Sequence, residues 1–414
     1  MSKSIKTYQP PSFNLVNFVI LAFVIYCVVV YKYAFNFPYL DDFDAILDFL
    51  NRYDLAAGKE SFVMLLGQHN EHRIFLTHLF SVATLKLFGS IYFPILIFLG
   101  NIGWFCVAIV FWQYAKKNAI SFSEFLPVPL VLLAFSHWGM MTWAMTSIQQ
   151  YWQILFCVLC IYFLTKGRLL PAGIFSVLAA FTGGGGLALA PLAILYFLIR
   201  RQWSLLLVCI VFFSAVLFVY FHLLPYSPPG TGRLLETFAH PIRFGAFFLG
   251  YLGGAFNVSL LGPLSFIVGG LILATLLLRN WRAHVRQNDF LTWVILFILI
   301  CAVLATINRS HLGMEAGGAS HYSVYSLLLI CCIYLRALTY ASGASHKKRL
   351  SFLCALAALL LFSYWLWRAP FYLEDRRHLL NHGYIIYPDR DGAKQVLENS
   401  KNQRIFNSPV PITD

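Results

Sequence analysis

Long apolar runs recur along this chain, and short polar segments separate them. A helix needs about 20 predominantly apolar residues to cross the hydrocarbon core of a bilayer. Only 11% of the residues are charged, whereas soluble domains carry about 25%, so most of the surface is expected to face lipid. The sequence therefore predicts an all-α polytopic integral membrane protein.

The first apolar run follows Lys3 and Lys6 and lacks a small-residue cleavage site of the A-x-A type. It is long enough to span, so it is predicted to be a signal anchor that leaves the N-terminus in the cytoplasm. Eleven runs are predicted to span the membrane, namely 14–34, 91–114, 125–141, 151–165, 169–182, 185–199, 203–224, 258–278, 290–307, 322–340 and 351–368.

The segment 73–88 fits either a further span or a helix on the outer membrane surface. A surface helix leaves the basic clusters of the later turns in the cytoplasm, as the positive-inside rule requires, and Thr77, Ser81 and Thr84 give it a polar stripe. The prediction is therefore a juxtamembrane helix, with the C-terminus outside. The cytoplasmic clusters are then 116–117, 166–168, 200–201, 279–286 and 347–349.

The net charge of +13 comes from Lys and Arg clusters that lie between the apolar runs. Such clusters are topology signals, and no basic stripe with interleaved aromatic residues follows any polar segment. A nucleic-acid partner is therefore not expected, and membrane lipids are. All nine cysteines fall inside apolar runs, so no disulfide framework is expected either.

Acidic side chains are distributed unevenly across this predicted topology. Only Glu124 and Asp289 of the seventeen acidic residues lie on the cytoplasmic side. Acidic residues contribute little to topology, so this asymmetry indicates function. The others gather in outer segments, of which three are large enough to build a site: 35–72, 225–257 and 369–414.

Two units are predicted along the chain. Residues 1–368 are expected to form a transmembrane domain with an outer loop at 35–90, and residues 369–414 a short cap on the outer face. No internal repeat is found, so the inverted-repeat signature of many secondary transporters is absent.

Asp41, Asp42 and Asp44 follow the outer end of the first predicted span. A carboxylate at this depth is shielded enough for its pKa to be tuned, and both water and a lipid headgroup can reach it. It could serve as a general base toward a sugar hydroxyl. The alternative is that these residues cap the amphipathic helix that follows. One aspartate suffices as a cap, so three within four residues favour a functional role.

A polar segment from Gly67 to Arg73 directly precedes an apolar helix. Arg73 and His72 are predicted to contact a donor phosphate, because a helix start offers free backbone N–H groups. His69 and Glu71 are predicted to contact a sugar or an acceptor. The alternative is an ordinary solvated turn. The histidine spacing matches no standard zinc pattern, so no metal site is predicted and no cofactor is certain, although a divalent cation stays open.

A second polar turn carries Arg309, His311, His321 and Tyr322 before the tenth predicted span. Arg is the side chain best shaped to hold phosphate oxygens bidentately, so Arg309 is the candidate contact to a lipid-linked phosphate, with His311 and His321 beside it. A solvated loop is the alternative. Tyr322 and Gln149 are assigned to acceptor binding, although the aromatic cluster around Gln149 fits an interfacial belt equally well.

The order of these features resembles the GT-C class of membrane glycosyltransferases, which take sugars from polyprenyl-phosphate donors. Asp41 and Asp42 follow the first span, and the long outer loop ends in a juxtamembrane helix, EHRIFLTHLFSVATLKLFG. Aminoarabinose and mannosyl transferases carry a His-Pro-Pro helix there, whereas this segment has no proline. Length, span count and the late Arg/His/Tyr turn look more like the serotype-converting O-antigen glucosyltransferases. The resemblance covers about the first 120 residues and the rest in outline.

The resemblance implies an inverting glycosyltransferase at the periplasmic face of a bacterial inner membrane. Its donor would be a polyprenyl-phosphate sugar, and its acceptor a lipid-linked glycan such as an O-antigen unit or lipid A. Asp41 or Asp42 would correspond to the catalytic base and Arg309 to the donor-phosphate contact. Two alternatives stay open: a flippase or transporter of a lipid-linked glycan, and an O-antigen polymerase or ligase. A transporter predicts charged residues or broken helices near mid-membrane.

Overall fold

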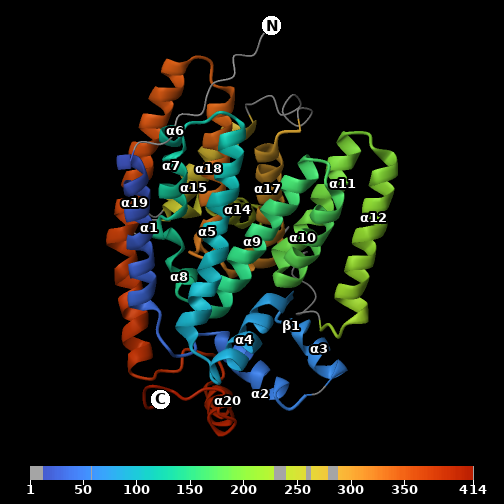
Figure 1. Ribbon diagram of the computed structural model, residues 1–414, viewed down its shortest axis with the longest axis vertical. Coiled ribbons are helices and arrows are strands. Elements are labelled where there is room, and N and C mark those ends of the chain that lie inside the picture. The colour runs from blue at the N-terminus through green and yellow to red at the C-terminus, as the bar shows by residue number, and fades with distance from the viewer. Residues whose placement is uncertain (1–12, 57, 228–238, 258–262, 278–287, 414) are drawn as a thin grey trace.

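The computed structural model describes residues 13–56, 58–227, 239–257, 263–277 and 288–413, and almost all regular structure in them is helical (Figure 1). Eight of the described helical stretches are long and apolar enough to cross a membrane, which confirms the prediction of an all-α membrane protein at that level. They are Asn14–Tyr33, Phe93–Lys117, Phe122–Met141, Ala144–Thr165, Trp203–Leu223, Phe290–Leu312, Ser323–Tyr340 and Ala344–Asn381.

The remaining three predicted spans correspond to shorter apolar helices. These are Leu169–Thr182, Gly184–Ile199 and Leu264–Leu277. Residues 258–262 and 278 of the predicted span 258–278 lie outside the described residues. Each is shorter than the roughly 20 residues of an untilted span. The count of eleven spans, the topology and the position of the termini therefore stay predictions.

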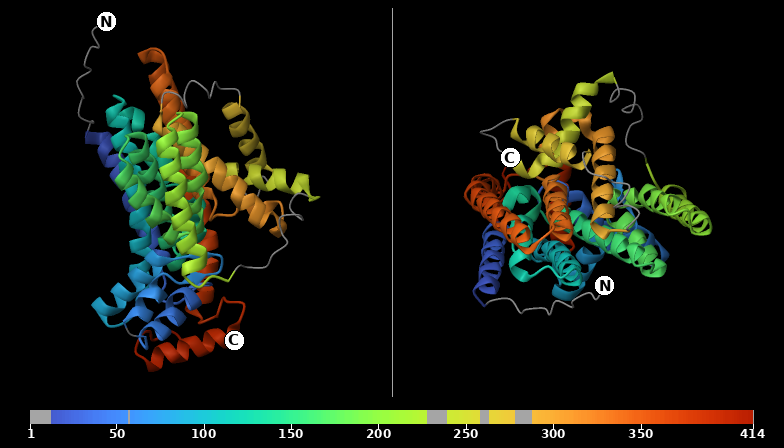
Figure 2. Two further views of the ribbon diagram at one scale, coloured as in Figure 1. Left: turned by 90° about the vertical axis from the view of Figure 1, so that its right-hand side faces the viewer. Right: turned by 90° about the horizontal axis from the view of Figure 1, so that it is seen from above.

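The bundle runs along the long axis of the molecule (Figure 1). Helix α9 lies at its centre and packs on α5 and α10, while α14, α15 and α17 gather on one side (Figure 2). The bundle elements are α1 (Phe13–Tyr33), α5 (Phe93–Lys117), α6 (Phe122–Phe125), α7 (Pro127–Leu132), η2 (Phe135–His137), α8 (Trp138–Met141), α9 (Ala144–Thr165), α10 (Leu169–Thr182), η3 (Gly184–Ala188), α11 (Leu189–Ile199), α12 (Trp203–Phe218), η4 (Val219–Leu223), α14 (Pro241–Gly253), η5 (Gly254–Phe256), α15 (Leu264–Leu277), α17 (Phe290–Arg309), η7 (Ser310–Leu312), η8 (Glu315–Gly318), α18 (Ser323–Tyr340) and α19 (Ala344–Asn381).

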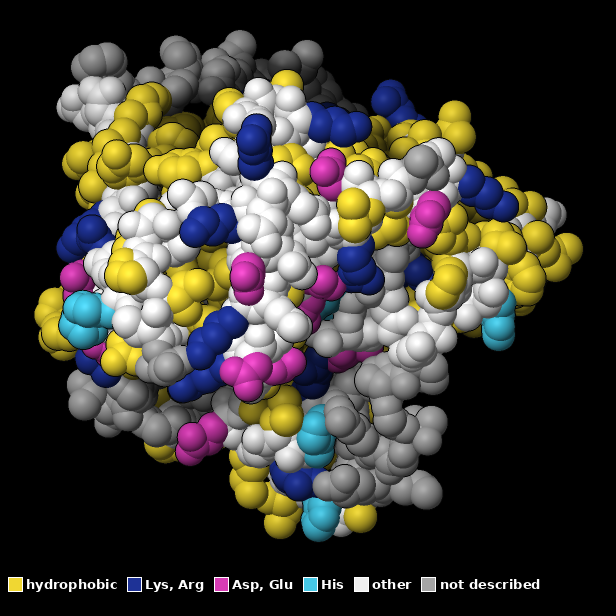
Figure 3. Space-filling model, turned by 90° about the horizontal axis from the view of Figure 1, so that it is seen from below, with side chains coloured by type: hydrophobic (Ala, Val, Ile, Leu, Met, Phe, Trp, Pro, Cys, Tyr) yellow, Lys and Arg dark blue, Asp and Glu magenta, His cyan; other side chains and the backbone are white. Residues whose placement is uncertain are grey.

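One end of the bundle, named here the loop end, carries the polar segments. The elements there are η1 (Phe43–Asp48), α2 (Phe49–Tyr53), α3 (Lys59–Leu65), β1 (Gln68–His69), β2 (His72–Arg73), α4 (Phe75–Phe88) and α20 (Arg390–Asn402) (Figure 1). Seen from this end, acidic, basic and histidine side chains are interspersed over the surface, and apolar side chains line its edge (Figure 3). The segment 73–88, predicted as a juxtamembrane helix, forms α4 beside α2 and α3.

The C-terminal tail, residues 369–413, packs on residues 41–54 at the loop end, which are named here the acidic segment. Asn51 Nδ2 donates to the carbonyl of Val396 at 3.1 Å, and Ser400 Oγ donates to Asn51 Oδ1 at 2.9 Å. Helix α19 continues past residue 368 to Asn381, with Pro370 inside it. The tail therefore begins inside a continuous helix.

Candidate functional site

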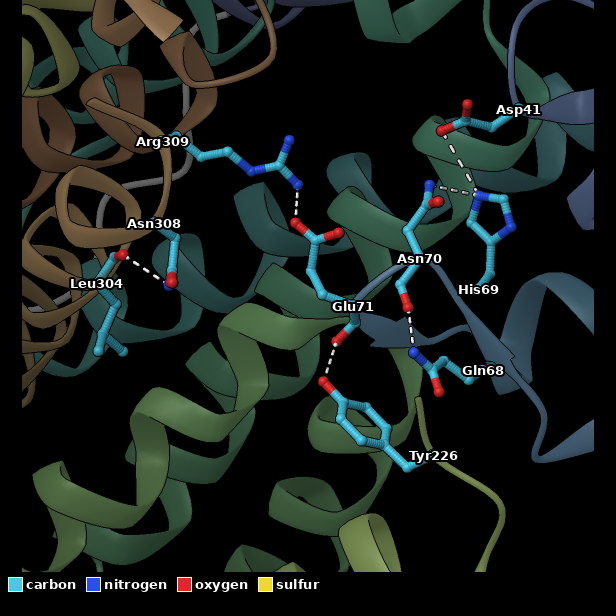
Figure 4. Close-up of polar contacts among 9 residues, drawn as sticks. All are labelled: Asp41, Gln68, His69, Asn70, Glu71, Tyr226, Leu304, Asn308 and Arg309. Atoms are coloured by element: carbon cyan, nitrogen blue, oxygen red, sulfur yellow. Dashed lines mark hydrogen bonds and ion pairs between the residues drawn. The ribbon is translucent and has the colours of Figure 1, made fainter. Parts of the chain in front are cut away.

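The polar segment Gly67–Arg73 folds into a small hairpin. Strands β1 and β2 pair antiparallel, with Gln68 opposite Arg73 and His69 opposite His72. Asn70 at the turn has a positive φ of 49°, a conformation that Asn tolerates better than most residues. Glu71 follows Asn70 at the tip of the hairpin, and its side chain points toward Arg309 (Figure 4).

Arg73 holds this hairpin to the bundle. Its Nε donates to Tyr220 O at 3.0 Å, Nη1 to Leu66 O at 2.7 Å, and Nη2 to the carbonyls of Leu224 and Pro225 at 3.3 and 3.2 Å. The side chain is fully buried, and the carbonyls at the end of a helix favour a cation. The donors of Arg73 therefore already have backbone partners, and its assignment to a donor phosphate stays a prediction.

The two polar segments singled out in the sequence meet at the loop end. Arg309, the last residue of α17, forms an ion pair with Glu71 of the hairpin (Figure 4). The Glu71 and Arg309 side chains keep 27% and 37% of their surface exposed. An anion arriving from solvent can therefore reach the Arg309 guanidinium.

Asp41 lies at the same end, beside His69 of the hairpin (Figure 4). Asp41 Oδ2 is 3.5 Å from His69 Nε2, and the same ring nitrogen is 3.1 Å from Asn70 Nδ2. The Asp41 side chain is 33% exposed, whereas that of His69 is 8% exposed. Asp41 is thus an accessible carboxylate whose position is set by a nearly buried imidazole.

Asp42 has different surroundings from its neighbour in sequence. It is buried, and its two oxygens accept hydrogen bonds from the backbone N–H groups of Met145 at 2.9 Å and Tyr39 at 3.2 Å. Burial raises the pKa of Asp42 to about 7, against the effect of these hydrogen bonds. The Met145 N–H belongs to the first turn of α9. Asp42 therefore fixes the start of α9 to the acidic segment. Its assignment as the base toward an acceptor hydroxyl stays a prediction.

Asp44 occupies an intermediate position in η1. Burial raises its pKa, and a hydrogen bond with the side chain of Tyr387 opposes this shift. Tyr387 belongs to the tail between α19 and α20. Asp44 therefore contributes to the contact between the acidic segment and the tail.

Two of the predicted histidines are neutral groups at pH 7. Withdrawal from water lowers the pKa of His72 to about 4. The pKa of His321 is lowered to about 4 as well, mainly by withdrawal of the ring from water and further by the nearby charge of Arg309. Both can donate or accept hydrogen bonds there, but neither adds positive charge for a phosphate. His311 lies in η7, directly after the helix that ends at Arg309.

The side-chain amides of Gln149 and Gln153 lie in the bundle beside the glycine turn that contacts the hairpin. A Cβ atom on Gly184 would collide with the His72 ring, so the glycine turn permits this close approach. Gln153 Nε2 donates to the Tyr325 hydroxyl at 3.1 Å. Gln149, assigned to acceptor binding, is buried and lies against Gly183.

Tyr322 lies at the start of α18 on the same side. Its ring centroid is 5.1 Å from that of Tyr251 and 4.1 Å from that of His321. The charge of Arg309 acts on Tyr322, where it opposes the rise in pKa that burial causes. Tyr322 and His321 therefore belong to the surroundings of Arg309, as their sequence proximity suggests.

Arg376 is a residue that the sequence analysis missed. It is buried near the end of α19, where its guanidinium lies 4.1 Å from the ring centroid of Tyr39. Nη1 donates to Gly139 O at 3.2 Å and to Thr142 Oγ1 at 3.0 Å, and its charge favours the ionised form of Asp42. In the sequence it is one of several charges in a row, and only its packing distinguishes it.

No group of three or more His, Cys, Asp or Glu residues placed to hold a metal ion occurs among the described residues. A divalent cation therefore gains no support from the geometry, and the prediction stays open. The candidate site contains a carboxylate in Asp41 and a cation in Arg309.

Comparison with protein-family models, with curated proteins and with solved structures gives no match to this chain. The resemblance to the GT-C class therefore stays a prediction from the order of the sequence features. The chemistry of Asp41, Glu71 and Arg309 is the basis on which a function is inferred.

Proposed function

We propose that this protein is an inverting glycosyltransferase that moves a sugar from a polyprenyl-phosphate donor to a lipid-linked glycan at the periplasmic face of a bacterial inner membrane. The observation that carries the proposal is the ion pair between Glu71 and Arg309. Arg309, the proposed phosphate contact at the end of α17, thereby lies beside the hairpin whose His69 is close to Asp41.

Asp41 is the proposed general base. An acceptor hydroxyl attacks the anomeric carbon of the donor sugar, and its proton passes to the Asp41 carboxylate. The bond between the anomeric carbon and the phosphate oxygen breaks as the new glycosidic bond forms, and polyprenyl phosphate leaves. A single displacement of this kind inverts the anomeric configuration. The exposed carboxylate of Asp41 supports this role better than the buried one of Asp42.

Arg309 is the proposed contact to the donor phosphate. As the anomeric bond breaks, negative charge grows on the leaving phosphate, and a fixed guanidinium stabilises this charge. Glu71 occupies Arg309 when no donor is bound, so the incoming phosphate replaces one anionic partner by another. The released Glu71 carboxylate can then accept hydrogen bonds from sugar hydroxyls.

Purified protein in proteoliposomes tests the proposal. A panel of polyprenyl-phosphate sugars is supplied with a lipid-linked acceptor, and release of polyprenyl phosphate and formation of the glycosidic product are measured. The proposal expects transfer with inversion by wild type and loss of transfer in Asp41→Asn. Retention of configuration, or full transfer by Asp41→Asn, contradicts it. Mass spectrometry of cellular glycans with and without the protein identifies the sugar.

A flippase or transporter of a lipid-linked glycan is the second candidate, because one membrane stretch is broken. The stretch Phe122–Met141 is interrupted by the 3₁₀ turn η2. Within it, His137 is buried and its Nδ1 lies 2.5 Å from the Tyr151 hydroxyl. Buried polar groups at a helix break are typical of transport pathways. Movement of the glycan lipid across the proteoliposome membrane without sugar transfer favours this candidate.

A further inference from the structure

A surface groove lies between α1 and α5, toward the loop end of the bundle. It has a cavity volume of about 730 Å³, within the range of small-molecule sites. Its apolar wall includes Val28 on α1 and Phe98 and Ile102 on α5. Both helices are long and apolar enough to span a membrane, so these side chains lie at the depth of lipid hydrocarbon if they do span.

Two cations line the same groove. Lys32 is in the last turn of α1, and Arg377 comes from the polar end of α19. Glu374 lies 3.8 Å from Lys32, and both of these side chains are more than half exposed. Such an exposed pair contributes little to stability, so Lys32 is available to another anion. Long cationic side chains at the ends of spans reach to the headgroup layer.

Helix α1 lies at the edge of the bundle and leaves most of its surface uncovered. Only 17% of its most apolar window is buried inside the protein, and Val28 and Tyr31 are exposed beside the groove. Among the described residues, the groove between α1 and α5 therefore has an apolar wall and two cationic side chains at its polar end. A molecule with a hydrocarbon chain and an anionic head matches both parts.

We propose that this groove binds one anionic phospholipid, with an acyl chain along Val28, Phe98 and Ile102 and its phosphate held by Lys32 and Arg377. The charge at the mouth favours an anionic over a zwitterionic headgroup, because two cations face one carboxylate, Glu374. The inference does not depend on the proposed transferase activity. It assigns the groove a bound lipid that lies between α1 and α5.

Native mass spectrometry of the full-length protein tests this proposal. The detergent-purified protein is titrated with phosphatidylglycerol or with phosphatidylcholine of the same acyl chains, and the lipid-bound fraction is measured. Wild type is expected to retain phosphatidylglycerol preferentially. The variant Lys32→Gln/Arg377→Gln is expected to weaken that binding about tenfold while its binding of phosphatidylcholine stays unchanged.

Two further variants separate the charge from the apolar wall. Lys86→Gln/Lys401→Gln removes two exposed lysines elsewhere at the loop end and is expected to leave lipid binding as in wild type. Ile102→Trp fills the groove and is expected to reduce phosphatidylglycerol binding with both cations in place. Equal retention of the two lipids, equal loss in the lysine control, or displacement of phosphatidylglycerol by an equimolar prenyl phosphate overturns the proposal.

Discussion

The side chains of Glu71 and Arg309, which are 238 positions apart in the sequence, form an ion pair at the loop end. Because both are partly exposed, at 27% and 37%, the pair is expected to contribute only about 0–1 kcal/mol to stability. A phosphate can bind the guanidinium bidentately through charge-assisted hydrogen bonds of the same kind as those of a carboxylate. The donor can therefore displace Glu71 without a large cost in free energy.

Replacement of Arg309 tests the phosphate contact. Arg309→Gln is expected to lower kcat/KM for the donor about 100- to 1000-fold, the usual effect of losing one stabilising group at a developing anion. Arg309→Lys keeps the charge but not the planar fork, so an intermediate loss is expected. Steady-state kinetics in proteoliposomes measure both. Equal activity of wild type and Arg309→Gln would show that the phosphate binds elsewhere.

Replacement of Glu71 tests the competition for Arg309. Glu71→Gln removes the anionic partner, so the donor KM is expected to fall about two- to fivefold, the equivalent of a surface ion pair. The measurement is a donor titration of wild type and variant at one ionic strength. An unchanged or higher KM contradicts the competition between Glu71 and the donor phosphate for Arg309.

Replacement of Asp41 tests the general base. Asp41→Asn is expected to lower kcat about 100- to 10,000-fold, with an unchanged thermal midpoint because this side chain is 33% exposed. Asp48→Asn is the matched control, since Asp48 is 38% exposed in the same segment and pairs with Arg52. The base assignment fails if both variants lose activity to the same extent.

Asp42 makes stability depend on pH. Its pKa is raised from 3.8 to about 7 in the folded protein, so between these values the folded state binds more protons than the unfolded state. Stability is therefore expected to fall as pH rises from about 4 to about 7, by an amount on the order of 4 kcal/mol, and to level off above pH 7.

The contribution of Asp42 to the pH dependence of stability is measured by comparing wild type with Asp42→Asn, because a second group titrates in the same pH range. The pKa of His72 is lowered to about 4, so its contribution to stability rises over about pH 4 to 6.5 and opposes that of Asp42. The thermal midpoint of wild type minus that of Asp42→Asn is therefore expected to fall between pH 4 and pH 7. A difference that is constant or increases over this range excludes a raised pKa at Asp42.

The contact between Gly184 and His72 predicts a coupled pair of substitutions. Gly184→Ala introduces a Cβ atom that collides with the His72 ring, and a destabilisation of about 1–3 kcal/mol is expected from such overpacking. In the His72→Ala background, the same change is expected to cost much less. A double-mutant cycle of thermal midpoints measures this coupling. Independent effects of the two changes would mean that the hairpin does not lie against the glycine turn.

The membrane character and the location of the polar segments could be predicted from the sequence, because apolar runs and charge are local properties. The difference between Asp41 and Asp42 could not be predicted. Both follow the first predicted span, and only the approach of Met145 and Tyr39 makes Asp42 a buried acceptor. One position along a chain is enough to turn a side chain from solvent to the interior.

Two arginines illustrate the same limit. Arg73 and Arg309 both lie next to the end of an apolar helix, so both look equally suited to a phosphate. The carbonyls that bind Arg73 come from residues near 220–225, at the end of η4. The partner of Arg309 is Glu71. Contacts between such distant segments depend on tertiary packing, which the local pattern does not contain.

The packing of the tail on the acidic segment has a consequence for the order in which the protein is made. Asn51 is held by Val396 and Ser400, and the carboxylate of Asp42 lies in the field of Arg376. Ribosomes add about 5–20 residues per second, so more than 300 residues are translated between Asn51 and its partners. During this interval of tens of seconds the acidic segment lacks its supporting contacts, so we expect the loop end to take its final arrangement only after the last helix has docked.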